Sequence, residues 1–112
     1  MRRRGSARRR SARQRLQILA RARIQILWEE AREEASKRPE LARRHVRSAK
    51  RIAQKARIKL PQEMVRHICR NCDSVLLPGS NARVRLRTNR SRHLSVTCLR
   101  CGHTARYYVN RS

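Results

Sequence analysis

The chain has 112 residues, of which 31 are Lys or Arg and only 7 are Asp or Glu, so its formal net charge is +24. A charge of this size favours a polyanionic partner, because phosphates neutralise it and release counterions. Wholly apolar runs are no longer than three residues, which excludes a membrane-spanning helix, and we expect a cytoplasmic protein without a membrane partner.

Arginine dominates the basic residues, with 27 Arg against 4 Lys, while the chain has one Trp, two Tyr and no Phe. Arginine grips phosphate with a planar fork of N–H donors, whereas RNA-binding domains that lay out single strands need aromatic platforms. The composition therefore predicts recognition of RNA through its backbone and shape.

Residues 1–12 consist mostly of arginine and small residues and show no apolar periodicity. We interpret this segment as a flexible basic arm. An arginine-rich start without acids also suits a mitochondrial presequence, but the helical pattern that follows runs on into glutamates, which disfavours that alternative.

Residues 13–60 predict two helices that double back as an antiparallel hairpin. Arg13 to Lys37 contains no Gly or Pro, its apolar residues recur every three or four positions, and Pro39 suits the first position of a second helix. The apolar face of the first helix is broader than one neighbouring helix would cover, so we expect it to contact a partner protein. The expected partner residues are Leu16, Ile24, Leu27 and Trp28. For Trp28, filling the groove between the two helices is favoured over contact with a partner, although it is kept among the partner residues.

Ion pairs are expected to help close this hairpin, because four of the seven acids lie late in the first helix. Each exposed pair is worth at most about 1 kcal/mol. The expected pairs join Glu33 and Glu34 to Arg43 and Arg44, and Glu29 and Glu30 to Arg47.

Four cysteines in residues 61–112 form two Cys-x2-Cys pairs, Cys69/Cys72 and Cys98/Cys101. Two such turns supply the four thiolates of a tetrahedral structural Zn²⁺ site. Disulfides are disfavoured because no signal peptide precedes the cysteines, and redox use is disfavoured because neither pair follows a strand at the start of a helix. Three histidines could in principle replace a thiolate, although four thiolates already complete the site: His67, His93 and His103.

Residues 82–87 alternate strictly between apolar and basic side chains, as expected of a strand with one arginine face. A basic loop follows it. The predicted phosphate-binding residues are Arg83, Arg85, Arg87, Arg90 and Arg92. Together with the cysteines, this pattern predicts a zinc ribbon. The fold class is α+β, with an N-terminal helical hairpin followed by a small antiparallel sheet.

Catalysis by this chain is disfavoured, since residues 61–112 contain only two acids, Glu63 and Asp73. Phosphodiester cleavage needs carboxylates that hold Mg²⁺ or a pair of groups for acid–base chemistry.

Several segments in one order resemble a known family. They are the two helices, Cys-x2-Cys, Leu-Leu-Pro-Gly, Asn-Ala-Arg-Val-Arg-Leu-Arg, an arginine-rich loop, and Thr-Cys-Leu-Arg-Cys-Gly-His followed by Arg-Tyr. Over residues 13–109 the chain resembles the zinc-ribbon protein subunit of archaeal ribonuclease P, which is related to a eukaryotic subunit of that enzyme. Arg106-Tyr107-Tyr108 departs from the family, which often has proline after the tyrosine.

The resemblance implies a role in removing 5′ leaders from precursor tRNA, with the RNA subunit as the catalyst and as the site of Mg²⁺. It implies that this protein supports the specificity domain of the RNA and aids substrate binding. It also implies partners: ribonuclease P RNA, a small β-barrel protein subunit that contacts the helical hairpin, other ribonuclease P proteins, and precursor tRNA. The main alternative is a zinc-ribbon structural protein of the ribosome, followed by a DNA-binding ribbon.

Overall fold

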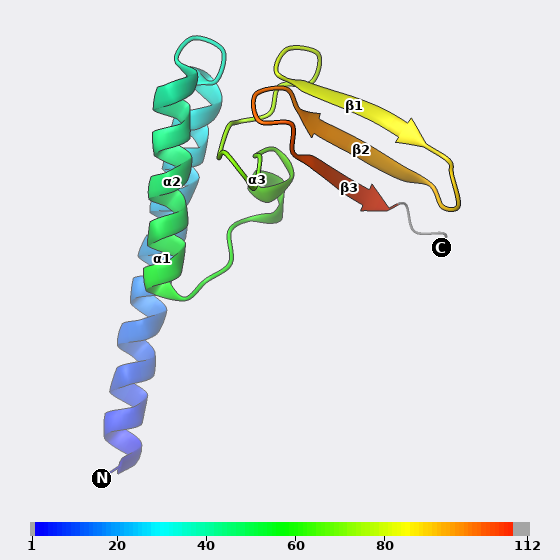
Figure 1. Cartoon of the computed structure of the whole chain (residues 1–112). Helices are drawn as coiled ribbons and strands as arrows, with labels where there is room; N and C mark the ends of the chain where they lie inside the picture. The colour runs from blue at the N-terminus through cyan, green and yellow to red at the C-terminus, as the bar shows by residue number, and fades with distance from the viewer. Residues whose placement is uncertain (1, 109–112) are drawn as a thin grey trace.

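The computed structural model describes residues 2–108, with side-chain packing from residue 7 onward. Two long helices, α1 (Arg2–Glu34) and α2 (Pro39–Ala56), form a hairpin, and the short α3 (Gln62–Arg66) leads to the sheet. The strands are β1 (Ala82–Arg87), β2 (His93–Cys98) and β3 (Thr104–Tyr108). Figure 1 shows the sheet standing beside the hairpin, with α3 between them. The predicted α+β fold is confirmed.

The first helix is longer than expected. It begins at Arg2, whereas the sequence predicted a helix from Arg13 after an irregular arm. Arginine and alanine are strong helix formers and no proline interrupts residues 2–12, so the backbone continues the helix without an apolar stripe. Gln17 marks the end of the hairpin, because its Nε2 donates to the carbonyl of Ala56 at 3.3 Å.

The second helix begins and ends as its sequence dictates. Pro39 occupies the first turn, where its missing N–H costs nothing. Arg57 closes the helix in the left-handed region with φ 55°, and the N–H of Ile58 returns to the carbonyl of Ala53 at 3.0 Å. This is the closing pattern that usually selects glycine.

One apolar core joins the hairpin to the base of the ribbon. Trp28 of α1 and Val46 of α2 are 2% and 0% exposed, and Met64 of α3 is likewise buried. Ala31 of α1 and Ala42 of α2 are both buried. Small side chains such as these allow the two helices to approach closely. The cluster consists of Ile24, Trp28, Ala31, Ala35, Ala42, Val46, Ala49, Ala53, Met64, Ile68 and Val75. The ribbon half therefore packs against the hairpin.

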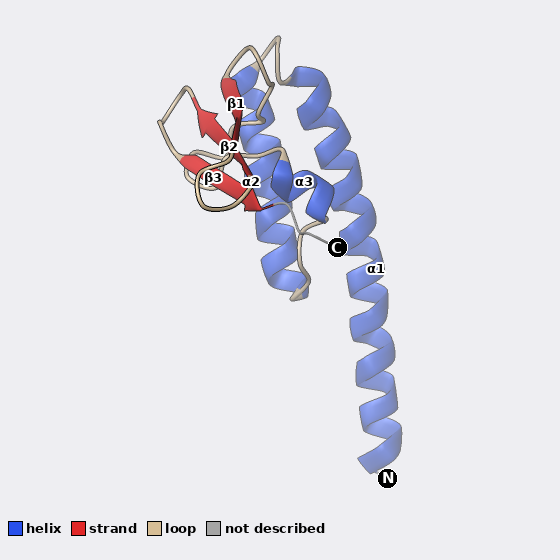
Figure 2. Cartoon of the chain, turned by 90° about the vertical axis from the view of Figure 1, so that its right-hand side faces the viewer, coloured by secondary structure: helices blue, strands red, loops and turns tan. Residues whose placement is uncertain are grey.

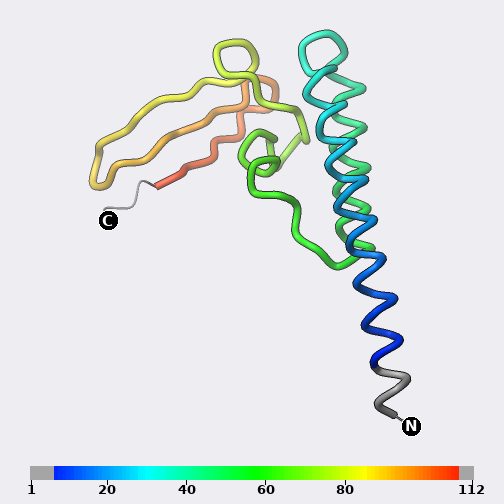
Figure 3. The backbone as a smooth tube through the Cα atoms, turned by 180° about the vertical axis from the view of Figure 1, so that it is seen from behind, coloured from blue at the N-terminus to red at the C-terminus, as the bar shows by residue number. Residues whose placement is uncertain are grey.

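The sheet is antiparallel, with the order β1-β2-β3. Figure 3 shows its strands curving away from the helices as a single layer. The register separates two faces, because Val84 lies opposite Val96, which lies opposite Ala105, whereas Arg85 lies opposite Ser95, which lies opposite Arg106. The alternation predicted for residues 82–87 is thus correct. Val109, the last residue of the segment that resembles the family, lies outside the described residues.

No helix within residues 2–108 combines the length and the apolar character that a bilayer crossing requires.

Candidate metal centre and nucleic-acid interface

Both Cys-x2-Cys turns have the same backbone construction. In the first, Cys69 N–H donates to the Ser74 carbonyl and Asp73 N–H donates to the Cys69 carbonyl, both at 2.9 Å. In the second, Cys98 exchanges the equivalent bonds with His103 and Gly102, both at 2.8 Å. Each turn therefore aims its two thiols at one point.

The residue after each second cysteine takes the left-handed conformation. Gly102 has φ 82°, as expected of a glycine, but Asp73 at the equivalent position has φ 61°. A non-glycine residue pays a cost of roughly 1 kcal/mol there, although Asp tolerates the region better than most. At this position the first turn therefore has a carboxylate side chain, at the cost of an unfavourable backbone conformation.

The four thiols form a compact cluster. All four Sγ atoms lie within 4.8 Å of one another, with Cys69 Sγ 3.4 Å from Cys101 Sγ and Cys72 Sγ 3.7 Å from Cys98 Sγ. Disulfide sulfurs would lie about 2.0 Å apart. Tetrahedral zinc bonds of about 2.3 Å place sulfurs roughly 3.8 Å apart. The cluster has the size that a tetrahedral metal ion requires.

Local environment differs among the four thiols. Burial raises the pKa of Cys69 to about 12, and burial also raises the pKa of Cys98. A hydrogen bond from the backbone N–H of His103 lowers the pKa of Cys101 to about 6. Burial alone would raise the pKa of Cys72, but hydrogen bonds from Ser74 outweigh it and lower the value. A metal ion that needs four thiolates must therefore displace protons from Cys69 and Cys98, whose pKa values burial raises.

The histidines lie outside the cluster of metal-binding side chains found in the described part of the chain. His67 Nδ1 lies 2.7 Å from the Glu63 carbonyl, and its ring faces Trp28 at 6.4 Å between centroids. His93 lies on β2 beside Tyr108, at 5.3 Å. His103 contributes to the second cysteine turn through its backbone groups, which bond to Cys98 and Cys101.

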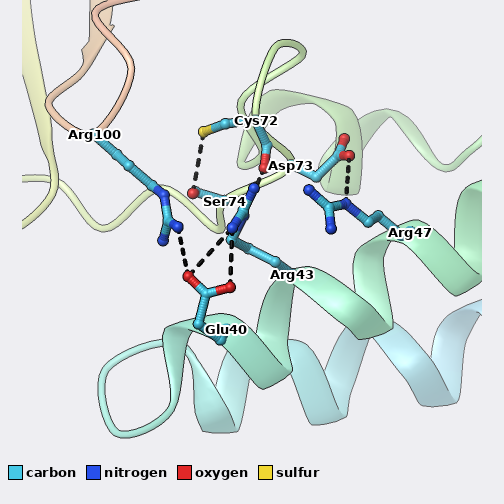
Figure 4. A network of polar contacts seen from close by, with 7 residues as sticks. All are labelled: Glu40, Arg43, Arg47, Cys72, Asp73, Ser74 and Arg100. Carbon is cyan, nitrogen blue, oxygen red and sulfur yellow. Dashed lines mark hydrogen bonds and ion pairs between the residues drawn. The ribbon is translucent and has the colours of Figure 1, made fainter.

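Polar contacts hold both cysteine turns against α2, as Figure 4 shows. Arg43 Nε donates to the Cys72 carbonyl at 2.8 Å, and its Nη1 reaches Glu40 Oε2 at 3.0 Å. Glu40 also binds Arg100 from the second turn, and this guanidinium lowers the pKa of the Glu40 carboxyl. One carboxylate thus bridges α2 and the second turn.

A second carboxylate, that of Asp73, connects the first turn to α2. Asp73 accepts from Arg47 Nε at 3.3 Å and pairs with Lys50, both on α2. Its side chain is 17% exposed, which limits screening by water. Left-handed Asp73 therefore ties the first turn to the hairpin at a second point, beside the bond from Arg43 to the Cys72 carbonyl.

These contacts correct the ion pairs expected within the hairpin. Among the described residues, neither Arg43 nor Arg47 pairs with an acid of α1. Arg43 binds Glu40 of its own helix and the Cys72 carbonyl of the ribbon, and Arg47 binds Asp73 of the ribbon. Glu30 lies 3.8 Å from His45 Nδ1, and Glu34 lies 3.9 Å from Arg38. The expectation failed because it considered only the two helices, while the basic edge of α2 faces a third element.

The polar face of the sheet is strongly basic. Across it, Arg83 aligns with Thr97 and Thr104, Arg85 with Ser95 and Arg106, and Arg87 with His93 and Tyr108. The three β1 arginines are exposed, as are Arg90 and Arg92 in the following loop. Residues 74–108 contain no acid. We call this surface the arginine face.

A shallow hollow of about 610 Å³ runs along the arginine face, from the loop after β1 to Thr97 and Thr104. Of the five predicted arginines, Arg87 and Arg90 line it, together with Arg106 and Tyr108. Arg106 was missed by the sequence analysis because its position depends on the pairing of β3 with β2. Alternation along residues 104–108 was the available signal.

The predicted partner residues divide into two groups. Ile24 and Trp28 are 1% and 2% exposed, so the chain's own core covers them. The expectation that they meet a partner is corrected, while the favoured interpretation of Trp28 as a packed side chain agrees with its burial. Leu27 is half-buried against the same core, and Leu16 is 54% exposed. Leu16 lies in an apolar groove of about 430 Å³ between α1 and α2, lined by Leu16, Leu19, Ala20, Arg23, Ile52, Lys55 and Ala56.

The fold and the cysteine cluster define a class: a helical hairpin that carries a four-cysteine ribbon with a basic sheet face. The family model described as "RNAse P Rpr2/Rpp21/SNM1 subunit domain" matches residues 23–102. The chain belongs to this family, as its resemblance to the archaeal ribonuclease P subunit predicted.

Relatives named "Ribonuclease P protein component 4" agree with this assignment. The protein of Methanopyrus kandleri is 56% identical over 69 residues, which span 62% of this chain and 54% of that protein. The protein of Pyrococcus furiosus is 46% identical over 89 residues, which span 80% of this chain and 76% of that protein.

Solved structures agree as well. A chain in the "cryo-EM structure of archaeal Ribonuclease P with mature tRNA" superposes with a TM-score of 0.77 at 44% identity, covering 81% of this chain and 77% of that one. The structure described as "Pfu Rpp21" gives a TM-score of 0.60, also at 44% identity, covering 80% and 99%.

Proposed function

We propose that this chain is a non-catalytic protein subunit of ribonuclease P, which removes 5′ leaders from precursor tRNA. In this proposal the chain binds and stabilises the specificity domain of the RNA subunit and aids substrate binding. The observation that carries it is the arginine face: the arginines of β1 and Arg106 of β3 lie on one face of the sheet, without an acid in residues 74–108, on a ribbon that contains the four-cysteine cluster.

Zinc is the metal that we propose for the cysteine cluster. Four sulfur ligands in a tetrahedral arrangement suit Zn²⁺, and the observed Sγ separations fit its bond lengths. Cys69, Cys72, Cys98 and Cys101 would hold it, and its role would be to fix the two turns that position the sheet.

Cleavage chemistry and its Mg²⁺ are assigned to the RNA subunit. Mg²⁺ prefers oxygen ligands, while the arginine face offers cationic donors that bind phosphate. We propose that Arg83, Arg85, Arg87, Arg90, Arg92 and Arg106 contact RNA phosphates, either of the RNA subunit or of precursor tRNA.

We propose that the apolar groove between α1 and α2 is the binding site of the small β-barrel protein subunit. Leu16, Leu19 and Ile52 offer apolar surface there, and Arg23 and Lys55 offer a basic edge. Other ribonuclease P proteins and the cytoplasmic location remain predictions.

The RNA-binding proposal is tested by Arg85→Gln combined with Arg106→Gln, which share one row of the sheet. Binding of ribonuclease P RNA should lose affinity, and its salt dependence should weaken by about 0.7–0.9 for each phosphate contact removed. Arg44→Gln combined with Arg51→Gln on the exposed side of α2 is the matched control of equal charge. Equal effects of the two pairs would contradict a specific role for the arginine face.

The partner proposal is tested with two leucine-sized side chains of equal exposure on α1. Leu19 in the groove is 63% exposed, and Ile18, which does not line it, is 62% exposed. Leu19→Glu should abolish binding of the β-barrel subunit, whereas Ile18→Glu should leave it nearly unchanged. Loss of binding with both variants, or with neither, would argue against the groove.

A further inference from the structure

The N-terminal half of α1 projects beyond the rest of the molecule. Gln17 contacts the last residue of α2, Ala56, so residues 2–16 extend past the end of the hairpin. Fifteen helical residues span roughly 22 Å. Figures 1 and 2 show this segment as a single helix that projects away from the other elements, and only Leu16 at its end borders α2, through the apolar groove. Every described side chain from Ala7 to Leu16 is exposed.

This projecting helix is built from arginine and small residues. Residues 2–16 contain eight arginines, and the first acid of the chain is Glu29. Apolar packing cannot hold the segment, because the stripe of large apolar side chains begins only at Leu16. Arginines four positions apart, such as Arg9 and Arg13, repel each other and disfavour the helix. A polyanion that neutralises them would remove this repulsion.

We propose that residues 2–16 form a second RNA-binding element, which lies between phosphate backbones of a folded RNA and is separate from the arginine face. Successive helical residues point about 100° apart, so Arg8, Arg9 and Arg10 face three directions. A flat anionic surface would meet only some of them, whereas an RNA groove presents phosphates on two sides. Ala7, Ser11 and Ala12 are small enough to let the helix backbone approach closely.

Phosphate is the expected ligand, not the bases. The segment has no aromatic ring for stacking, and arginine binds phosphate oxygens with two parallel N–H donors. It also lies outside residues 23–102, the part that the family model matches. The inference therefore adds a contact beyond the proposed role of the ribbon.

The test uses the full-length chain with Arg8, Arg9, Arg10 and Arg13 all changed to Gln. Glutamine preserves helix propensity, and the projecting side chains make no contact that folding needs. Binding is measured against salt concentration with ribonuclease P RNA and, separately, with precursor tRNA. The slope should weaken by about 0.9 for each arginine on a duplex phosphate, up to about 3.6 for all four. The RNA that shows the loss is the one bound.

Changing the same four residues to Lys is the matched control, since it keeps the charge and should keep most of the slope. Hydrogen exchange provides a second readout, because bound RNA should protect the amides of residues 8–15. The inference is overturned if the Gln variant leaves both slopes unchanged and RNA gives these amides no protection. It is equally overturned if the variant loses binding only to anionic vesicles or to an acidic protein.

A triple change of Arg83, Arg85 and Arg87 to Gln separates this inference from the proposed function. If the triple variant weakens the slope and the N-terminal variant does not, the proposed function survives and the second element is wrong. If only the N-terminal variant weakens it, the role of the arginine face fails while the second element stands.

Discussion

The hairpin and the ribbon are stabilised by different means. Helix α2 alone buries Ala42, Val46, Ala49, Ala53 and Ala56. In the three strands together, only Ala82 and Cys98 are buried. The small ribbon core consists of Cys69, Leu76, Ala82 and Cys98, so half of it is made of proposed metal ligands. Packing can sustain the hairpin, whereas the sheet would depend on the metal proposed for its cysteines and on the contacts that tie it to α2.

The largest effect should come from Cys98→Ser. A structural zinc site contributes on the order of 10 kcal/mol of folding free energy, most of which an incomplete ligand set forfeits. Metal content should fall to near zero and the amides of β1–β3 should lose protection from exchange, while the helicity of α1 and α2 persists. Ser95→Ala is the control on the same strand. Full zinc occupancy in the Cys98 variant would contradict the view that the ribbon depends on a complete set of metal ligands.

Trp28→Ala should give the next largest effect, because it opens a cavity in the core shared by both halves. Buried aromatic residues changed to Ala typically cost 3–5 kcal/mol in the free energy of unfolding. Trp28→Phe should cost much less, since the buried Nε1 has no hydrogen-bond partner among the described residues. Denaturant unfolding of the two variants checks the order. Similar losses would mean that the indole has a role beyond filling space.

Asp73 tests how the ribbon is tied to the hairpin. Asp73→Ala removes the contacts to Arg47 and Lys50 and places Ala in the left-handed region, so we expect a loss of about 1–2 kcal/mol. Asp73→Gly relieves the backbone and should recover roughly 1 kcal/mol of that loss. Gly102→Ala should show the backbone cost alone, also about 1 kcal/mol. If Asp73→Gly is no more stable than Asp73→Ala, the left-handed backbone is not the source of the cost.

The smallest effect should come from Glu40 and should depend on pH. Because Arg100 lowers the pKa of Glu40 in the folded protein, its stabilising contribution is complete above the unfolded pKa near 4.5 and is lost as the pH falls through the lower folded value. Melting temperatures of the wild type and Glu40→Gln should therefore differ at pH 6–7 and converge toward pH 3. A difference that persists unchanged at pH 3 would contradict this origin.

Local patterns in the sequence predicted the elements and the cysteine cluster well. Cys-x2-Cys spacing encodes two identical turns, and strict alternation in residues 82–87 encodes the arginine face. Contacts between distant segments were not predictable in this way. Trp28 belongs to the same buried cluster as Met64, Ile68 and Val75, which lie far along the chain. Periodicity within one helix cannot show which of its apolar residues such distant segments will bury.

The same limitation explains why the ion pairs predicted within the hairpin were wrong. Arg43 and Arg47 had acids available on α1. Because the ribbon rests on α2, Arg43 instead binds the Cys72 carbonyl, besides Glu40 of its own helix, and Arg47 binds Asp73. The start of α1 was missed for the opposite reason: intrinsic helix propensity extends it to Arg2, while the sequence analysis relied on apolar periodicity alone.

The central claim is that a metal-fixed, cationic scaffold serves a catalytic RNA. The most direct measurement is to purify the tagged chain from its own cells and to sequence the RNA that accompanies it, with the metal content determined on the same sample. The account predicts ribonuclease P RNA together with one zinc ion per chain. Ribosomal RNA as the dominant species, or no RNA at all, would contradict it.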